Sequence, residues 1–322
     1  MDPVATNSGA AADMSNGKTW FHFEERGVFW GMRLILATYG LLGRAVCLCL
    51  VNAVVLYYWL SHGKARAAST NYLQRIAQHP NSTVVADRRT SLRHFMQFGA
   101  AVVDKFAAWR GDITFEQVHI PDRSPLERIL DTGRGGVLIG AHLGNMDVCR
   151  AMSQMRDDIR LNVLVHTRHA EKFNRLLGEI SDNVNLALIQ VSELSPATAI
   201  LLQQRVDAGE LVVIMGDRVP LSGGQRTVPA PFLGEPAPFP QGPFILASLL
   251  KCPVLTLFCT REKNHFQIEF RPLADRIILP RRDRDTAMAG YIQDYAAQLE
   301  AQCLRYPLQW FNFYDFWHQD TL

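Results

Sequence analysis

An uninterrupted apolar run from Ala45 to Leu60 limits what this chain can fold into more than any other feature of its sequence. A segment this apolar has to be buried, either among other helices or in the hydrocarbon core of a membrane. At about 1.5 Å per helical residue, the run is slightly shorter than a hydrocarbon core roughly 30 Å thick. It ends in Tyr57, Tyr58 and Trp59, an aromatic cluster typical of a membrane interface. We therefore expect one membrane-anchoring helix, which spans the membrane or lies in its interface.

Two alternatives to an anchor remain for this segment. A helix extended back to Met32 is long enough to span a membrane, but it then contains Arg44, which is costly unless the side chain snorkels or pairs. Because of this cost, the first alternative is that the segment is a buried helix of a soluble protein. A cleaved signal peptide fits less well, because far too many residues precede the cleavage-like sequence at residues 65–67.

Composition divides the chain into three parts. Residues 1–19 are small and polar without hydrophobic periodicity, so we expect a disordered leader there. Residues 20–62 form the expected helical anchor, and residues 63–322 form the expected catalytic domain. The hydrophobic content of 48% is ample for a core of that size.

Charge and cysteine usage exclude several classes of protein. The chain has 33 Lys and Arg residues against 31 Asp and Glu residues, which leaves a net charge of +2. This balance argues against a nucleic-acid-binding protein, because such proteins neutralise phosphates with an excess of basic residues. None of the six cysteines forms a C-x-x-C pair, so the sequence supports neither a disulfide scaffold nor a thiolate metal site. We expect a reducing compartment and no bound metal.

Short apolar runs alternate with helical stretches beyond residue 136. The runs have the length of buried strands and cover residues 137–141, 162–166, 211–215, 253–258 and 266–270. The helices expected between them cover residues 145–155, 171–180, 196–208 and 242–250. This alternation predicts an α/β layered domain with a mixed, largely parallel sheet.

The sequence GAHLGNMD places His142 at the point where the first of these strands turns into a helix. Asp147 follows five residues later, so one helical turn can bring its carboxylate under the imidazole. A carboxylate on one ring nitrogen fixes the tautomer and leaves the other nitrogen free as a base. Gly144 and Asn145 lie in the turn, where backbone N–H groups at the helix N-terminus could stabilise an oxyanion. The arrangement suits deprotonation of a hydroxyl that attacks an acyl carbon.

The His-x4-acid spacing is not specific by itself. About one match is expected by chance in a chain of this composition, and the sequence contains two, at His142 with Asp147 and at His166 with Glu171. Only His142 lies between a predicted strand and a turn bracketed by glycines. A structural histidine that caps the strand remains the alternative.

Four motifs follow one another over roughly residues 137–260. The first is AHLGNMD, with a His-x4-Asp/Glu spacing. Arg168 and Asn174 come after the next strand, Asp217 ends a further strand, and PFLG at residues 231–234 is the fourth motif. In this order they resemble the motifs of the lysophospholipid acyltransferase superfamily, and within it of the bacterial lipid A late acyltransferases. There an Arg and an Asn, an acidic residue and a Phe-Phe-Gly turn follow the first motif.

Three features depart from the lipid A enzymes. The chain has Asp147 where they more often carry Glu, and Arg218 follows Asp217 in place of an Asp-Gln type motif. An aromatic tail at residues 309–317 replaces a basic end. These features resemble a subgroup found with bacterial pigment (aryl polyene, xanthomonadin-like) or other lipid gene clusters. Core packing is the default interpretation of the tail, with a membrane-contacting belt or an acyl-groove wall as alternatives.

The resemblance implies a membrane-associated acyltransferase that moves a fatty or polyenoyl acyl group from a thioester carrier to a hydroxyl of a lipid or glycolipid. It implies acyl carrier protein as the donor, with coenzyme A as the alternative, and no resident cofactor. His142 is then the general base and Asp147 the residue that orients it. The residues expected to bind phosphate or the acceptor are Arg168, Asn174, Asp217 and Arg218. The expected location is the bacterial inner membrane, with the catalytic domain facing the cytoplasm.

Two other functions fit the same residues. A thioester hydrolase would use the same pair to activate water and would need no acceptor. A non-catalytic, membrane-anchored protein would bind the acyl chain and would be indifferent to His142→Ala.

Overall fold

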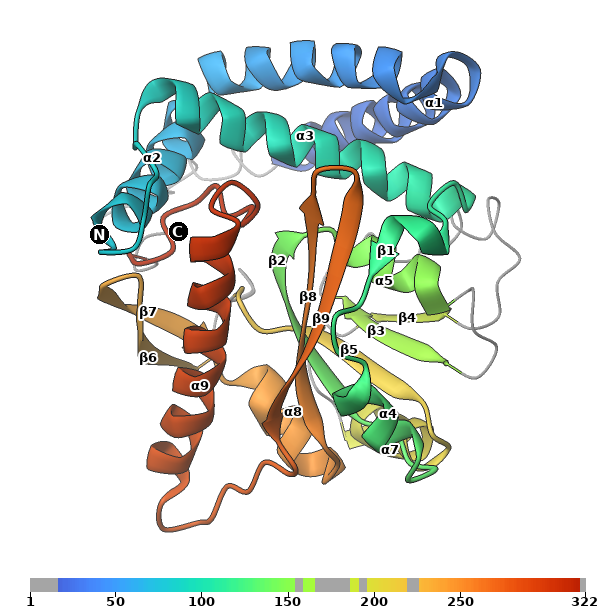
Figure 1. The fold of residues 1–322 in the computed structure, drawn as a ribbon, viewed down its shortest axis with the longest axis vertical. Coiled ribbons are helices and arrows are strands. Elements are labelled where there is room, and N and C mark those ends of the chain that lie inside the picture. Colours follow the sequence, from blue (N-terminus) through green and yellow to red (C-terminus); the bar gives the residue numbers. More distant parts are fainter. Residues whose placement is uncertain (1–16, 154–158, 166–185, 191–195, 219–225, 319–322) are drawn as a thin grey trace, which may run out of the picture. The chain divides into compact units, whose positions relative to one another are not determined.

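The computed structural model describes residues 17–153, 159–165, 186–190, 196–218 and 226–318 (Figure 1). The chain separates into two compact units, Met1–Val51 and Asn52–Leu322, whereas the composition places the end of the anchor at residue 62. The predicted disordered leader lies outside the described residues, apart from residues 17–19, which begin the first helix.

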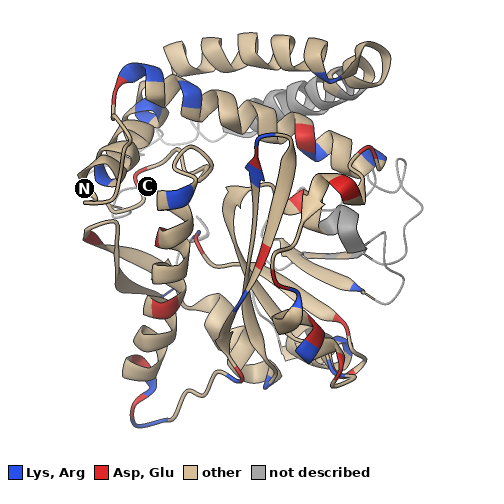
Figure 2. Cartoon of the chain, in the orientation of Figure 1, with Lys and Arg blue, Asp and Glu red and all other residues tan. Residues whose placement is uncertain are grey.

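Helix α1 (Gly17–Ser61) is kinked at Gly43, whose φ of 76° and ψ of 178° are not helical. Its portion from Ala37 to Ser61 is long enough and apolar enough to cross a membrane. Beyond Gly43 this helix carries a single charged side chain, that of Arg44, so it is almost uncoloured in Figure 2. The predicted apolar helix is therefore present, and it fits a membrane-associated protein.

A seven-stranded sheet forms the centre of the unit Asn52–Leu322, with the strand order β1-β9-β8-β2-β5-β3-β4. Neighbouring strands are parallel except for β8 and β9, which are antiparallel. The strands are β1 (Val118–His119), β2 (Val137–Gly144), β3 (Leu161–Val165), β4 (Leu186–Gln190), β5 (Leu211–Met215), β8 (Val254–Glu262) and β9 (His265–Ala274). This is the mixed, largely parallel sheet that the alternating apolar runs predict.

Helices cover both faces of this sheet, which explains why its central strands are continuously apolar. The elements that share the main core on one face are α2 (Gly63–Gln78), α7 (Pro196–Asp207), α8 (Gly242–Leu250) and α9 (Arg284–Arg305). The elements on the other face are η1 (Phe115–Gln117), α4 (Ser124–Leu130) and α5 (Met146–Ser153). Helix α3 (Arg88–Arg110) packs against both α2 and α5.

A separate antiparallel hairpin is formed by β6 (Thr227–Phe232) and β7 (Glu235–Pro240). Its two turn residues, Leu233 and Gly234, have φ of 50° and 88°, as a type I′ turn requires. The sequence indicated the turn but not the strands, because the prolines in both arms argue against a strand.

Candidate active site

His142 lies near the carboxyl end of β2, where the pairing of this strand with β8 is irregular. Gly140 pairs with Leu257 and Gly144 pairs with Cys259, so four residue steps along β2 match two steps along β8. Such a bulge redirects side chains and is often found next to active sites. The His142 side chain remains 31% exposed at this point, so a substrate can reach it.

The carboxylate that pairs with His142 belongs to Asp217, which lies just beyond the end of β5. Asp217 Oδ1 is 2.8 Å from His142 Nδ1, and Asp217 Oδ2 accepts the backbone N–H of His142 at 2.8 Å. Trp310 Nε1 donates to the same Oδ2 at 2.9 Å. Because β2 and β5 are parallel neighbours, their carboxyl ends meet at one edge of the sheet.

The environment keeps Asp217 ionised although its side chain is fully buried. Burial raises the pKa of this carboxyl, but the charge of His142, the hydrogen bonds that His142 donates and the charge of Arg218 together lower it below its usual value. A carboxylate on Nδ1 holds the neutral imidazole in the tautomer with a lone pair on Nε2. Among the described residues Nε2 has no hydrogen-bonding partner, so this nitrogen can act as a base.

Asp147 lies in the first turn of α5, but helix α3 holds its carboxylate. Trp109 Nε1 donates to Asp147 Oδ1 at 3.1 Å, and Lys105 Nζ lies 3.0 Å from Asp147 Oδ2. The structure therefore differs from the predicted pairing, because the carboxylate on His142 Nδ1 belongs to Asp217, whereas the His-x4-Asp spacing predicts Asp147 as the partner of the imidazole. The bulge in β2 turns His142 toward the end of β5, while the Asp147 contacts connect α5 with α3.

Gly144 and Asn145 form the turn from β2 into α5. Gly144 has a φ of 67°, and a Cβ atom there would lie 1.9 Å from the carbonyl oxygen of Cys259, so only glycine fits. Asn145 caps the helix, since its Oδ1 accepts the Asp147 N–H at 3.2 Å. The N–H groups of Gly144 and Asn145 donate to the carbonyls of Gln309 and Cys259, each at 2.7 Å. These two predicted oxyanion donors are thus already engaged, and the contacts support their role in the turn.

Arg218 contacts the C-terminal tail. Its Nη2 donates to the carbonyl oxygen of Phe311 at 2.8 Å, which uses one of the five N–H donors of a guanidinium group. Arg168 and Asn174, which the family motif places in the same site, lie outside the described residues. Within the part of the chain that the structure describes, no group of three or more potential ligands could hold a metal ion.

The C-terminal segment Gln309–Phe311 crosses the end of β2, a contribution that the sequence did not predict. Leu143 and Trp310 form an antiparallel bridge, and the Phe311 N–H donates to the carbonyl oxygen of His142 at 2.8 Å. Trp310 is fully buried, in agreement with core packing as the interpretation of the aromatic tail. The aromatic density of the tail is a sequence signal for packing, but it does not indicate which strand the tail contacts.

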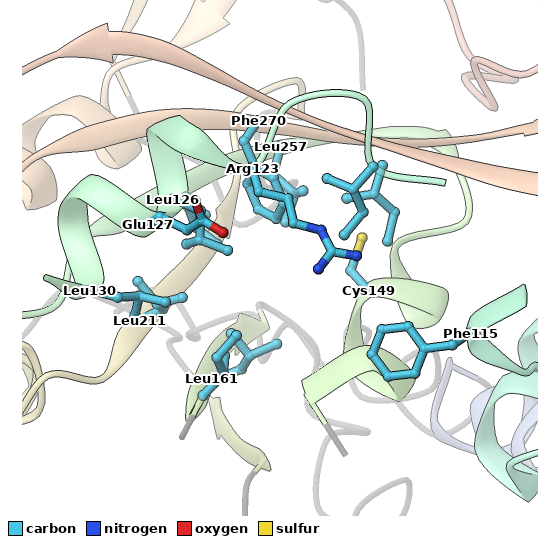
Figure 3. A pocket seen from close by; sticks show the side chains of 14 residues that line it. Phe115, Arg123, Leu126, Glu127, Leu130, Cys149, Leu161, Leu211, Leu257 and Phe270 are labelled. Atoms are coloured by element: carbon cyan, nitrogen blue, oxygen red, sulfur yellow. The ribbon is translucent and has the colours of Figure 1, made fainter. Parts of the chain in front are cut away.

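A largely apolar pocket lies on the sheet face that carries α4 and α5 (Figure 3). It contains about 650 Å³ of unfilled space, part of which is open to solvent. Leu161, Leu211 and Leu257 line it from the sheet, while Arg123 and Glu127 contribute its charged side chains. The pocket has the apolar character that an acyl chain requires, but its lining does not include His142 or Asp217.

The pocket lies on the face of β2 that carries Leu138 and Gly140, just before the bulge that contains His142. Leu138 lines the pocket, and the residues that alternate with Leu138, Gly140 and His142 pack in the main core on the other face. A Cβ atom at Gly140 would lie 3.0 Å from Met146 Cε and 3.3 Å from Met215 Sδ. Two flexible thioether side chains therefore cover the strand between the pocket and His142.

Comparison with known proteins identifies one family. The family described as bacterial lipid A biosynthesis acyltransferase matches residues 21–319, which is nearly the whole chain. The matched range includes His142, Asp217 and Trp310. No curated protein matches the chain significantly.

Proposed function

Because the chain belongs to the bacterial lipid A biosynthesis acyltransferase family, we propose that it transfers an acyl group from a thioester carrier to a hydroxyl of a lipid or glycolipid. The observation that carries this proposal is the His142–Asp217 pair. The pair combines a buried carboxylate on Nδ1 with an Nε2 that is open to a substrate.

His142 is the general base in the mechanism we propose. Its Nε2 removes the proton from the acceptor hydroxyl as the hydroxyl oxygen attacks the thioester carbonyl carbon. Asp217 stabilises the imidazolium that forms and holds its orientation. The tetrahedral intermediate then collapses, the C–S bond breaks, and the imidazolium returns the proton to the thiolate of the carrier.

The apolar pocket lined by α4 and α5 is our candidate for the site that binds the acyl chain. Leu138 of β2 lines it four residues before His142, so a chain attached to a carbonyl near His142 can extend along the strand toward Leu138. Such a chain has to displace Met146 and Met215, which thioether flexibility permits.

Arg218 is our candidate for binding an anionic group of a substrate. A guanidinium suits the phosphate of a phosphopantetheine arm or of a lipid headgroup. We propose acyl carrier protein as the donor, with coenzyme A as the alternative, and Arg168 and Asn174 as further contacts. We also propose the bacterial inner membrane as the location, with the catalytic unit in the cytoplasm, where such carriers are found.

Mass spectrometry of lipid extracts tests this function. The host with the intact gene is compared with hosts that carry His142→Ala or His318→Ala at matched protein levels. His318 is an exposed histidine that contacts Asp315, so it serves as the control. We expect His142→Ala alone to lose one lipid species and to accumulate a precursor lighter by one acyl group. Identical profiles in all three strains would contradict the proposal, and thioester cleavage without any acylated lipid would indicate a hydrolase.

A further inference from the structure

Trp310 connects the catalytic pair with a second histidine, His94, which is buried. Its indole Nε1 donates to Asp217 Oδ2 at 2.9 Å, and its carbonyl oxygen lies 2.9 Å from His94 Nε2. The side chains of Trp310 and Asp217 and the residue His94 are all fully buried. Trp310 is therefore bound to the site through its side chain and to helix α3 through its main chain.

A chain of hydrogen bonds continues from His94 to the end of α1. Because the carbonyl oxygen of Trp310 can only accept, His94 Nε2 carries the proton and His94 Nδ1 is the acceptor. Ser69 Oγ lies 3.0 Å from His94 Nδ1, and Ser91 Oγ lies 3.1 Å from Ser69 Oγ. Trp59 Nε1 donates to Ser91 Oγ at 3.2 Å. Each hydroxyl then donates to the next member, so every donor points from Trp59 toward Trp310.

Because these hydrogen-bonding groups are buried, His94 stays neutral at neutral pH, and the donors keep the same direction from Trp59 toward Trp310. Removal from water lowers the pKa of His94 to about 4, although the hydrogen bond to the Trp310 carbonyl opposes the shift. A neutral histidine with one donor and one acceptor matches its two partners, Ser69 and Trp310.

The two donors on Oδ2 determine how the Asp217 carboxylate is oriented. The terminal torsion of an aspartate is broad, so its own conformational preference does not fix the plane of the carboxylate. The His142 N–H and the Trp310 indole N–H both bind Oδ2, which leaves Oδ1 facing His142 Nδ1. Without the indole N–H, one donor remains on Oδ2 and the carboxylate is less restricted.

We propose that Trp310 is a positioning residue for acyl transfer: its indole N–H holds the Asp217 carboxylate against His142, and the hydrogen-bonded chain from Trp59 to His94 holds Trp310. This inference rests on the proposed function. The same hydrogen bonds connect the catalytic pair with Trp59, at the end of the apolar helix.

A double-mutant cycle tests this role. Acyl transfer from palmitoyl-acyl carrier protein to total host lipid is measured with the full-length protein in detergent, for the wild type, Trp310→Phe, Asp217→Asn and the double variant. We expect Trp310→Phe to lower kcat by about 10- to 100-fold, because small misplacements of a catalytic group have effects of this size. The KM for the donor should stay unchanged, and Trp310→Phe should have no further effect in the Asp217→Asn background.

Two further variants separate positioning from packing. Trp317→Phe is the matched control, because Trp317 packs against Trp310 but donates its indole N–H to the carbonyl oxygen of Phe232. It should lower kcat much less than Trp310→Phe. Replacement of Trp310 by β-(3-benzothienyl)alanine removes only the N–H and keeps the shape of the side chain. This variant should reproduce the loss in kcat even if Trp310→Phe folds poorly.

Each result leads to a different conclusion. Equal losses from Trp310→Phe in both backgrounds, or full activity of the benzothienyl variant, would overturn the positioning role and leave the proposed function intact. Full activity of Asp217→Asn, or no transfer by the wild type, would contradict the proposed function and this inference with it.

Discussion

The pH dependence of stability offers a direct test of the burial of His94. Its pKa is about 4 in the folded protein against 6.5 for an ordinary histidine. Between these values the unfolded chain binds a proton that the folded chain does not bind, so the free energy of unfolding falls as the pH falls. One pH unit corresponds to about 1.36 kcal/mol, and the window is about 2.5 units wide. His94 should therefore cost the protein about 3 kcal/mol of stability as the pH decreases from 6.5 to 4.

The perturbation that isolates this effect is His94→Gln, which keeps a donor and an acceptor but does not titrate. Unfolding free energies are measured by denaturant titration in a non-ionic detergent at a series of pH values from 7 to 4. The wild type should lose about 3 kcal/mol more than His94→Gln across this window. His318→Gln, which changes an exposed histidine, should follow the wild type. Parallel profiles for the wild type and His94→Gln would refute the reasoning that His94 is buried and neutral.

The turn and the pocket give two more predictions. Gly144→Ala should lower the free energy of unfolding by more than about 4 kcal/mol, because its Cβ would overlap the backbone of β8. Gly111 has a similar φ of 77° and open space around it, so Gly111→Ala should lower the free energy of unfolding by only about 1–2 kcal/mol. Equal losses of unfolding free energy in the two variants would contradict the close approach of β2 and β8. Leu161→Trp should fill the pocket and shift the transferred acyl groups toward shorter chains in mass spectra of the product. An unchanged distribution of chain lengths would contradict our assignment of the pocket.

Five of the seven described strands of the sheet were predictable, because buried strands leave a local signal in the sequence, whereas β1 and β4 were not predicted. The strand predicted at residues 211–215 and the helix predicted at residues 242–250 coincide with β5 and α8. The hairpin of β6 and β7 was not predicted, since its prolines obscure the strands and its pairing depends on a turn with positive φ. Helix α9 was also missed, because the predicted helices are those between the predicted strands, and residues 284–305 come after the last of these strands.

The site was predictable only where its residues are close in sequence. His142 is recognisable from the glycines and the strand around it. Its partner is not, because Asp217 lies 75 residues away, and its pairing depends on the neighbouring positions of β2 and β5 and on the bulge in β2. Trp310 is a further 93 residues beyond Asp217. Both Asp217 and His142 follow predicted strands, which is the signal that could have connected them, but local spacing favoured Asp147.

The rates of Asp217→Asn and Asp147→Asn, measured side by side, test most directly whether Asp217 is the catalytic partner of His142. Both changes replace a carboxylate by an amide of the same size, and both proteins are assayed with the same thioester donor and lipid acceptor. We predict that Asp217→Asn lowers kcat by roughly 10³- to 10⁴-fold, the loss expected when the carboxylate that orients a catalytic histidine is removed. Asp147→Asn, which alters the contact between α5 and α3, should lower kcat far less than Asp217→Asn. The opposite ranking, with Asp147→Asn inactive and Asp217→Asn active, would contradict the assignment of Asp217 as the partner of His142.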